Sequence, residues 1–201
     1  MTADCRVLFF GDSFVAGVGD PEARGWVGRV AAASAEADLA FLPYVLGVRR
    51  ETSVQVAARW LAEARPRMAQ DADCRVVFSF GANDATAESG SQRVEPGVTL
   101  GTLRRVLGEA AGMALPVFVV GPGPVGEREP DLRIAELTQR MGAVCEQREV
   151  AFAAVAESLC GCASWTSEAA AGDGAHPGAG GYDALARLVL KAGWLDWLRK
   201  P

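Results

Sequence analysis

Three short polar segments of this chain carry side chains that could perform acyl-transfer chemistry together. Gly11-Asp12-Ser13-Phe14 supplies a hydroxyl, Gly81-Ala82-Asn83-Asp84 an amide, and Asp173-Gly174-Ala175-His176-Pro177 a carboxylate and an imidazole. A serine is a weak nucleophile until a base takes its proton. Because His176 is the single histidine of the sequence, any mechanism that needs an imidazole base must use it.

His176 and Asp173 are spaced so that they can complete such a site. Asp173 lies three residues before His176 and can accept the second ring N–H, which fixes the tautomer and stabilises the imidazolium. We therefore expect Ser13, Asp173 and His176 to be the catalytic residues. The oxyanion that forms on attack needs preorganised donors, and we expect these from the backbone N–H groups of Ser13 and Gly47 and the side-chain amide of Asn83.

Apolar runs alternate with helical patterns along the chain and predict the elements that position these side chains. We expect strands at 6–10, 39–46, 75–80, 116–120 and 150–152. We expect helices at 26–37, 53–65, from Pro96 or Gly97 to 113, at 131–149 and from Pro177 onward, with a break at Gly193 before 194–198, and a loop at 161–175. Strands that are near-continuous apolar runs are typical of a parallel sheet with helices on both faces. Polar segments that follow such strands meet at one edge of the sheet, where ligands bind.

Each polar segment has an ordinary structural explanation when it is taken alone. Ser13 could cap a helix, Gly81-Ala82-Asn83-Asp84 could be a turn, and Asp173 could cap the helix that starts near Pro177. Average residue usage gives three such segments in this order, each after an expected strand, in about one of 10⁴ to 10⁵ chains. The combination therefore indicates a catalytic site.

The chain resembles the SGNH hydrolases of the GDSL esterase/lipase superfamily. Gly11-Asp12-Ser13-Phe14 matches the block that carries the nucleophile, Gly81-Ala82-Asn83-Asp84 matches the third block, and residues 173–177 match the fifth. The resemblance covers nearly the whole chain. It implies an α/β fold, a three-layer α/β/α sandwich with a five-stranded parallel sheet of the flavodoxin-like type, and ester or thioester hydrolysis through an acyl-serine.

The second block of the family is less well matched. Its oxyanion glycine matches Gly47, and Thr52-Ser53 ends the block as in many members. The family often has Asn where Val45 stands and a further Gly where Arg50 stands. This arrangement also brings Arg49 and Arg50 close to the expected site, so both are candidate substrate-binding residues.

We expect a serine hydrolase that cleaves carboxylic esters of small molecules. A thioesterase, or a deacetylase of acetylated sugars, would use the same residues. A non-catalytic carbohydrate- or acyl-binding module on the same fold is a further alternative, which the intact set of Ser13, Asp173 and His176 disfavours. A fluorophosphonate probe should label the enzyme and not an inert module.

Composition sets further limits on function. A chain of 201 residues with 50% hydrophobic and 22% charged residues predicts one soluble globular domain over residues 1–201. A net charge of −5 argues against a sequence-independent nucleic-acid binder, and no apolar run has the length of a membrane helix.

Histidine and cysteine usage bears on cofactors and on the compartment. One histidine excludes a multi-histidine metal site, and Cys160 and Cys162 are closer than the usual zinc-binding pair, so we expect no metal or cofactor. The odd count of five scattered cysteines indicates free thiols in a reducing cytoplasm. The first residues also lack the basic start and apolar stretch of a signal peptide.

Overall fold

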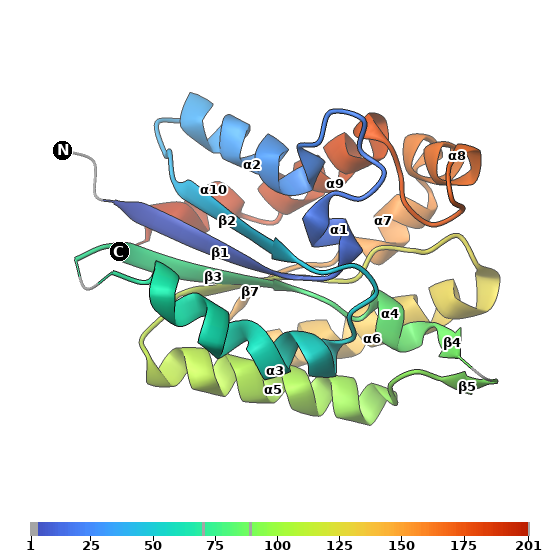
Figure 1. Cartoon of the computed structure of the whole chain (residues 1–201), viewed down its shortest axis with the longest axis horizontal. Helices are drawn as coiled ribbons and strands as arrows, with labels where there is room; N and C mark the ends of the chain where they lie inside the picture. The colour runs from blue at the N-terminus through green and yellow to red at the C-terminus, as the bar shows by residue number, and fades with distance from the viewer. Residues whose placement is uncertain (1–3, 70, 89, 201) are drawn as a thin grey trace.

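A five-stranded sheet forms the centre of the computed structural model, which describes residues 4–69, 71–88 and 90–200 (Figure 1). Its strands are β1 (Cys5–Gly11), β2 (Leu42–Gly47), β3 (Asp73–Ser79), β6 (Val117–Val120) and β7 (Ala151–Ala153). Their order is β2-β1-β3-β6-β7, and every neighbouring pair is parallel. The predicted parallel sheet is confirmed. Residues 1–3, on which part of the signal-peptide argument depends, lie outside the described residues.

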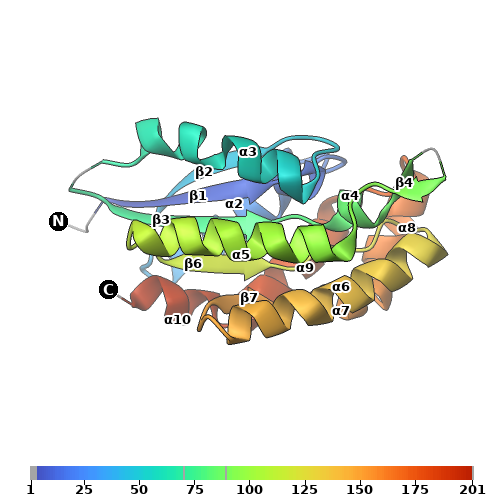
Figure 2. The same ribbon diagram turned by 90° about the horizontal axis from the view of Figure 1, so that it is seen from below.

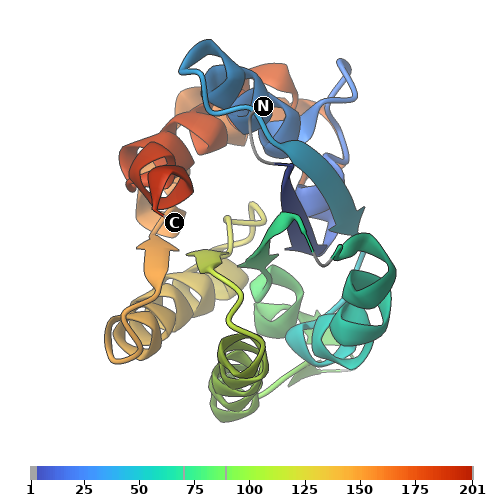
Figure 3. The same ribbon diagram turned by 90° about the vertical axis from the view of Figure 1, so that its left-hand side faces the viewer.

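Helices cover both faces of this sheet, as the end view in Figure 3 shows. One layer contains α2 (Gly25–Glu36), α9 (Ala179–Lys191) and α10 (Trp194–Arg199), and the other contains α3 (Ser53–Ala64), α5 (Pro96–Gly112) and α6 (Arg128–Glu146). Because successive side chains of a strand point to opposite faces, Val7 and Phe9 of β1 pack in the first layer, while Leu8 and Phe10 pack in the second. The result is a three-layer α/β/α architecture, as expected.

Shorter elements connect the sheet to the helices and were not predicted. They are α1 (Ser13–Ala16), the 3-10 turn η1 (Arg65–Arg67), α4 (Ala82–Ala85), the antiparallel pair β4 (Ala87–Glu88) and β5 (Ser91–Gln92), α7 (Ala156–Cys160) and α8 (Ala163–Ala171). The β4–β5 pair lies beyond α4 at one end of the sheet (Figures 1 and 2). Most of these elements are too short to show a hydrophobic period.

The interpretation of 161–175 as a loop is wrong, because α8 occupies most of it. Its small residues have little hydrophobic pattern, and only Trp165 and Ala169, one helical turn apart, are buried. Its alanines favour the helix through their intrinsic propensity. The loop that does exist begins after α8 and contains Asp173 and His176.

The edge strand β2 is less buried than the other strands of the five-stranded sheet. It begins at Leu42 and not at 39, and Leu42 and Val45 are exposed, because one edge of β2 has no neighbouring strand in the described sheet. No helix in the described part of the chain has the length and apolar character needed to cross a membrane.

Candidate active site

Ser13, His176 and Asp173 form a hydrogen-bonded series at the carboxyl end of the sheet. Ser13 is the first residue of α1, directly after β1, and His176 lies in the loop between α8 and α9. Ser13 Oγ lies 2.7 Å from His176 Nε2, and His176 Nδ1 lies 2.8 Å from Asp173 Oδ2. These distances allow the imidazole to take the hydroxyl proton while the carboxylate holds the other ring nitrogen.

The Asp173 carboxylate is held by the backbone of its own loop. Its Oδ1 accepts hydrogen bonds from the N–H groups of Ala175 at 3.1 Å and His176 at 3.0 Å. The His176 backbone N–H is the main cause that lowers the pKa of Asp173 to about 2, and the His176 side chain also contributes. Arg49 Nη2 donates to Asp173 Oδ2 at 3.2 Å. Asp173 therefore stays ionised and can stabilise a protonated His176.

Asp12 fixes the position of Ser13 from the buried side. It is the N-cap of α1, and its Oδ1 accepts a hydrogen bond from the N–H of Phe14 at 3.0 Å. The side chain is 2% exposed, and burial raises the pKa of its carboxyl group to about 7. The helix ends after one turn at Gly17, which has the left-handed φ of 71° that glycine tolerates.

Asn83 lies on α4 and lines the same cavity as Ser13. Its Nδ2 donates to the backbone oxygen of Glu51 at 3.0 Å and to Asp12 Oδ2 at 3.3 Å. The amide nitrogen is therefore held between two acceptors from segments that are distant in the sequence. The nitrogen end of the amide is the end that can stabilise a negative oxygen.

Gly47 has a packing role at the end of β2. A Cβ at this position would lie 2.3 Å from the nitrogen of Ala16 and 2.6 Å from the backbone oxygen of Asp12. Only glycine permits this approach of β2 to α1. Among the described residues, Gly47 is absent from the lining of the cavity that contains Ser13, whereas Arg49 and Arg50 line it.

The turn after β2 brings a different backbone segment to the cavity. The N–H of Glu51 donates to the oxygen of Val48 at 3.3 Å, and Arg50 has a φ of 70°. A left-handed third residue is typical of a type II turn, where glycine is preferred. Sequence reasoning did not assign Arg50 a backbone role, although the family's frequent glycine at that position was a signal for one.

The cavity at this site has a volume of about 380 Å³. Its lining includes the cations Arg49, Arg50 and Arg93 and the acids Glu88, Glu127 and Asp173, besides Ser13, Asn83 and His176. Arg93 pairs with Glu88 at 3.4 Å and donates to the backbone oxygen of Arg50 at 3.1 Å. The cavity is thus small and has charged groups of both signs in its lining.

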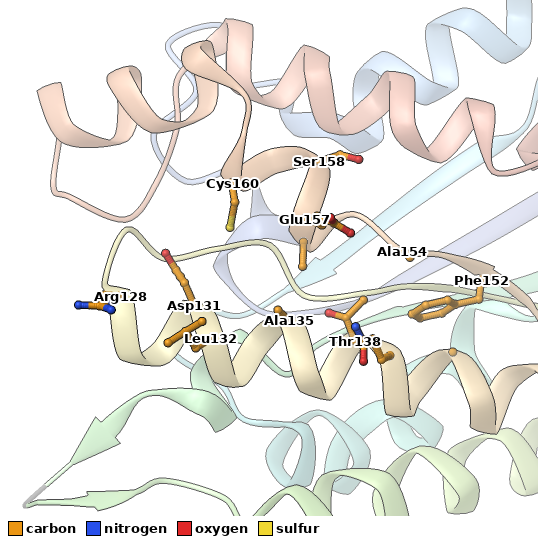
Figure 4. A pocket seen from close by; sticks show the side chains of 13 residues that line it. Arg128, Asp131, Leu132, Ala135, Thr138, Phe152, Ala154, Glu157, Ser158 and Cys160 are labelled. Atoms are coloured by element: carbon orange, nitrogen blue, oxygen red, sulfur yellow. The ribbon is translucent and has the colours of Figure 1, made fainter.

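A larger cavity of about 760 Å³ lies between α6 and α7, with Leu132, Thr138, Phe152 and Cys160 in its lining (Figure 4). None of the predicted site residues lines it. In the described parts of the chain, no group of three or more histidine, cysteine, aspartate or glutamate side chains is arranged to hold a metal ion.

A three-layer α/β/α fold with a serine–histidine–aspartate series at the carboxyl edge defines a class of hydrolases. Residues 9–184 match the GDSL-like lipase/acylhydrolase family, and the chain belongs to this family of ester hydrolases. The expected family and enzyme class are thereby confirmed.

Solved structures agree with this fold. A lipase/acylhydrolase from Enterococcus faecalis is 23% identical over 94% of this chain and 95% of that chain, with a TM-score of 0.74. Axe2, an acetylxylan esterase from Geobacillus stearothermophilus, is 18% identical over 100% of both chains, with a TM-score of 0.77. TesA is 22% identical over 94% of this chain and 97% of that chain, with a TM-score of 0.74. No curated protein sequence matches the chain significantly.

Proposed function

We propose that this protein hydrolyses small carboxylic esters through an acyl-serine intermediate on Ser13. The observation that carries the proposal is the hydrogen-bonded series of Ser13, His176 and Asp173, with its contacts of 2.7 Å and 2.8 Å. A series of this geometry can both generate the nucleophile and return the proton to the leaving group.

The proposed reaction has two halves. His176 takes the proton of Ser13 as the hydroxyl oxygen attacks the ester carbonyl, and the tetrahedral intermediate collapses as His176 protonates the departing alcohol. A water molecule then attacks the acyl-serine while His176 takes its proton, and the second tetrahedral intermediate collapses as His176 returns that proton to Ser13 Oγ, which releases the acid. The ionised Asp173 favours each step in which the imidazole is charged.

We assign the oxyanion donors to the N–H of Ser13, the Nδ2 of Asn83 and the N–H of Arg50, in place of that of Gly47. Two observations support Arg50: it lines the cavity, and no backbone carbonyl of the described residues accepts a hydrogen bond from its N–H. Gly47 is instead packed against α1. A backbone donor aimed at the developing charge would lower the barrier as a side-chain donor does.

The substrate is proposed to be short. A cavity of about 380 Å³ accommodates a small acyl group, and the full-length likeness to an acetylxylan esterase makes acetylated carbohydrates a second candidate substrate class. Thioesters would use the same residues. Arg49 and Arg50, which line the cavity, are proposed to contact polar or anionic parts of the substrate.

A cytoplasmic location is proposed as well. Support comes from the cysteines, since Cys5, Cys74, Cys145, Cys160 and Cys162 are all free thiols. Free thiols are typical of reducing compartments.

The variant Ser13→Ala tests the proposed function. Wild-type protein should hydrolyse members of a panel of nitrophenyl acyl esters, acetylated sugars and acyl-CoAs and react with a fluorophosphonate probe, whereas the variant should lose roughly 10⁴–10⁶-fold in kcat and all labelling. Ser158→Ala is the matched control, because Ser158 is exposed and lines the other cavity. Wild-type turnover in Ser13→Ala, or loss of turnover in the control alone, would overturn the assignment.

A further inference from the structure

The carboxylate of Asp12 contacts two parts of the site at once. Its Oδ1 accepts the hydrogen bond from the N–H of Phe14 at 3.0 Å, and its Oδ2 accepts one from Asn83 Nδ2 at 3.3 Å. The side chain is 2% exposed, so these partners must replace the water that the carboxylate loses.

Capping α1 does not by itself require a carboxylate. A cap needs one acceptor oxygen, which serine, threonine or asparagine supplies as well as aspartate does. The second oxygen of Asp12 reaches Asn83, which is 71 residues away in the sequence. This contact joins the turn that carries the nucleophile to the turn that carries the amide.

The orientation of the Asn83 amide decides whether it can stabilise an oxyanion. Rotation about its last side-chain torsion is nearly free, so oxygen and nitrogen can exchange places unless neighbours distinguish them. In its ionised form the Asp12 carboxylate only accepts hydrogen bonds and repels the amide oxygen, and the backbone oxygen of Glu51 is an acceptor whether Asp12 is ionised or not. With Asp12 Oδ2 on one side and the backbone oxygen of Glu51 on the other, only the Nδ2 end fits between them.

We propose that Asp12 is a positioning residue that selects the oxyanion-binding orientation of the Asn83 amide and couples it to Ser13. The inference rests on the proposed function, in which Asn83 donates to the oxyanion. The contact of 3.3 Å with Asp12 is the longer of the two bonds of Nδ2. A hydrogen in such a long contact can be shared with a third acceptor, so the oxyanion can bind without displacing Asp12.

The substitution Asp12→Asn separates the two contacts. The two contacts use different oxygens of Asp12, and asparagine has an NH₂ group in place of one of them, so it can accept from Phe14 or from Asn83 at these two positions but not from both. We expect kcat for the best nitrophenyl ester to fall by about 10- to 100-fold, which is the scale of a misplaced donor. The KM should stay within about threefold, because the oxyanion exists only after attack. A purely structural role would not lower kcat while leaving KM nearly unchanged.

A double-mutant cycle tests whether Asp12 acts through Asn83. Asn83→Ala alone should lower kcat by about 10²–10³-fold. If Asp12 only orients this amide, the variant with both substitutions should lie within about threefold of Asn83→Ala. Losses that multiply, or wild-type kcat in Asp12→Asn, would overturn the inference.

Thr99→Val supplies a matched control in the same buried region. The Thr99 hydroxyl donates to Asp84 Oδ2 at 2.6 Å and is fully buried, and the other Asp84 oxygen accepts from the N–H of Ser53 at 2.7 Å. This variant should melt at a lower temperature and keep kcat within about threefold of wild type, because it loses a buried hydrogen bond that does not involve the amide. An equal loss of kcat in Thr99→Val would mean that a general loss of packing in this buried region explains the result, and the inference would fail.

A second substitution covers the case in which Asp12→Asn does not fold. Asp12→Ser retains a capping oxygen but is too short to reach Asn83, and the same fall in kcat is expected. If neither variant folds, Asp12 is structural and the inference fails. If Ser13→Ala or Asn83→Ala keeps wild-type kcat, the proposed function fails; if both lose activity and Asp12→Asn does not, only the role of Asp12 fails.

Discussion

Two carboxylates of the site, Asp173 beside His176 and Asp12 beside Asn83, have surroundings that are opposite in kind. Asp173 is 42% exposed at its side chain and is held by N–H groups that follow it within three residues. Asp12 is 2% exposed, and one of its partners comes from a segment 71 residues away. The exposed side of the site is thus a local loop, whereas the buried side depends on the packing of separate elements.

Because their environments differ, the two carboxyl groups have different pKa values. Hydrogen bonds from the backbone and from the imidazole lower the pKa of Asp173 to about 2, so Asp173 is ionised at any pH well above that value. Burial, with the nearby Asp84 as a smaller cause, raises the pKa of Asp12 to about 7. Asp173 is suited to stabilising a developing positive charge, and Asp12 to fixing geometry by hydrogen bonds.

The largest expected effect concerns the exposed side. Asp173→Asn should lower kcat by about 10⁴-fold, because an amide next to His176 Nδ1 favours the wrong tautomer. The fold should be kept, since the amide oxygen can still accept the N–H groups of Ala175 and His176. Steady-state kinetics and thermal melting measure both quantities. A smaller loss of kcat than in Asp12→Asn would contradict the proposal that Asp173 stabilises the charged His176 while Asp12 only positions Asn83.

The contributions of Asp12 and Asp173 to the free energy of unfolding should change in opposite directions with pH. Because the pKa of Asp12 is higher in the folded chain, its contribution favours folding at low pH and is lost as the pH rises from about 4 to about 7, at up to about 1.4 kcal/mol per pH unit. The free energy of unfolding of Asp12→Asn, relative to wild type, should therefore rise over that range. The lowered pKa of Asp173 acts in reverse, and its contribution is lost as the pH falls from about 4 to about 2.

Urea unfolding at a series of pH values measures this difference. Asp38→Asn is the matched control, because Asp38 is exposed and asparagine also tolerates its positive φ of 59°. A flat difference between Asp12→Asn and wild type from pH 4 to pH 7 would contradict the raised pKa of Asp12.

The same contrast explains what could be predicted from the sequence. The series of Asp173 and His176 is visible there because its spacing is local. The contact of Asp12 with Asn83 is not, since it depends on how α1 and α4 meet. Central strands were predicted because their apolar runs are buried on both faces, whereas the extent of β2 was not, because an edge strand is partly exposed.

The glycine of the second block shows a different limit. A glycine can be required by close packing or by a left-handed φ, and the sequence does not distinguish these causes. Gly47 meets the first requirement against α1. The left-handed position near the cavity is occupied by Arg50. Because this residue is not a glycine, the sequence itself does not indicate the turn.

A moderate effect is expected at Arg50. Glycine should relieve the left-handed φ of 70°, so Arg50→Gly should raise the free energy of unfolding by about 0.5–1 kcal/mol. Its kcat for neutral esters should stay near wild type, because the backbone N–H remains. Arg49→Gly is the control and should destabilise, since the φ of Arg49 is not positive. Destabilisation of Arg50→Gly, measured by urea unfolding, would contradict the strained turn.

The smallest effect is expected where Arg49 meets Asp173. The contact of 3.2 Å joins side chains that are 59% and 42% exposed, and ion pairs of this kind contribute about 0.2–1 kcal/mol. Arg49 and His176 Nδ1 both contact Oδ2 of Asp173. Removal of the Arg49 side chain therefore leaves this oxygen available to the imidazole. Arg49→Ala should therefore keep kcat for neutral esters within about threefold. A rise in KM confined to anionic esters would identify Arg49 as a substrate-binding residue, whereas a fall in kcat as large as that of Asp173→Asn would mean that the exposed side of the site depends on Arg49.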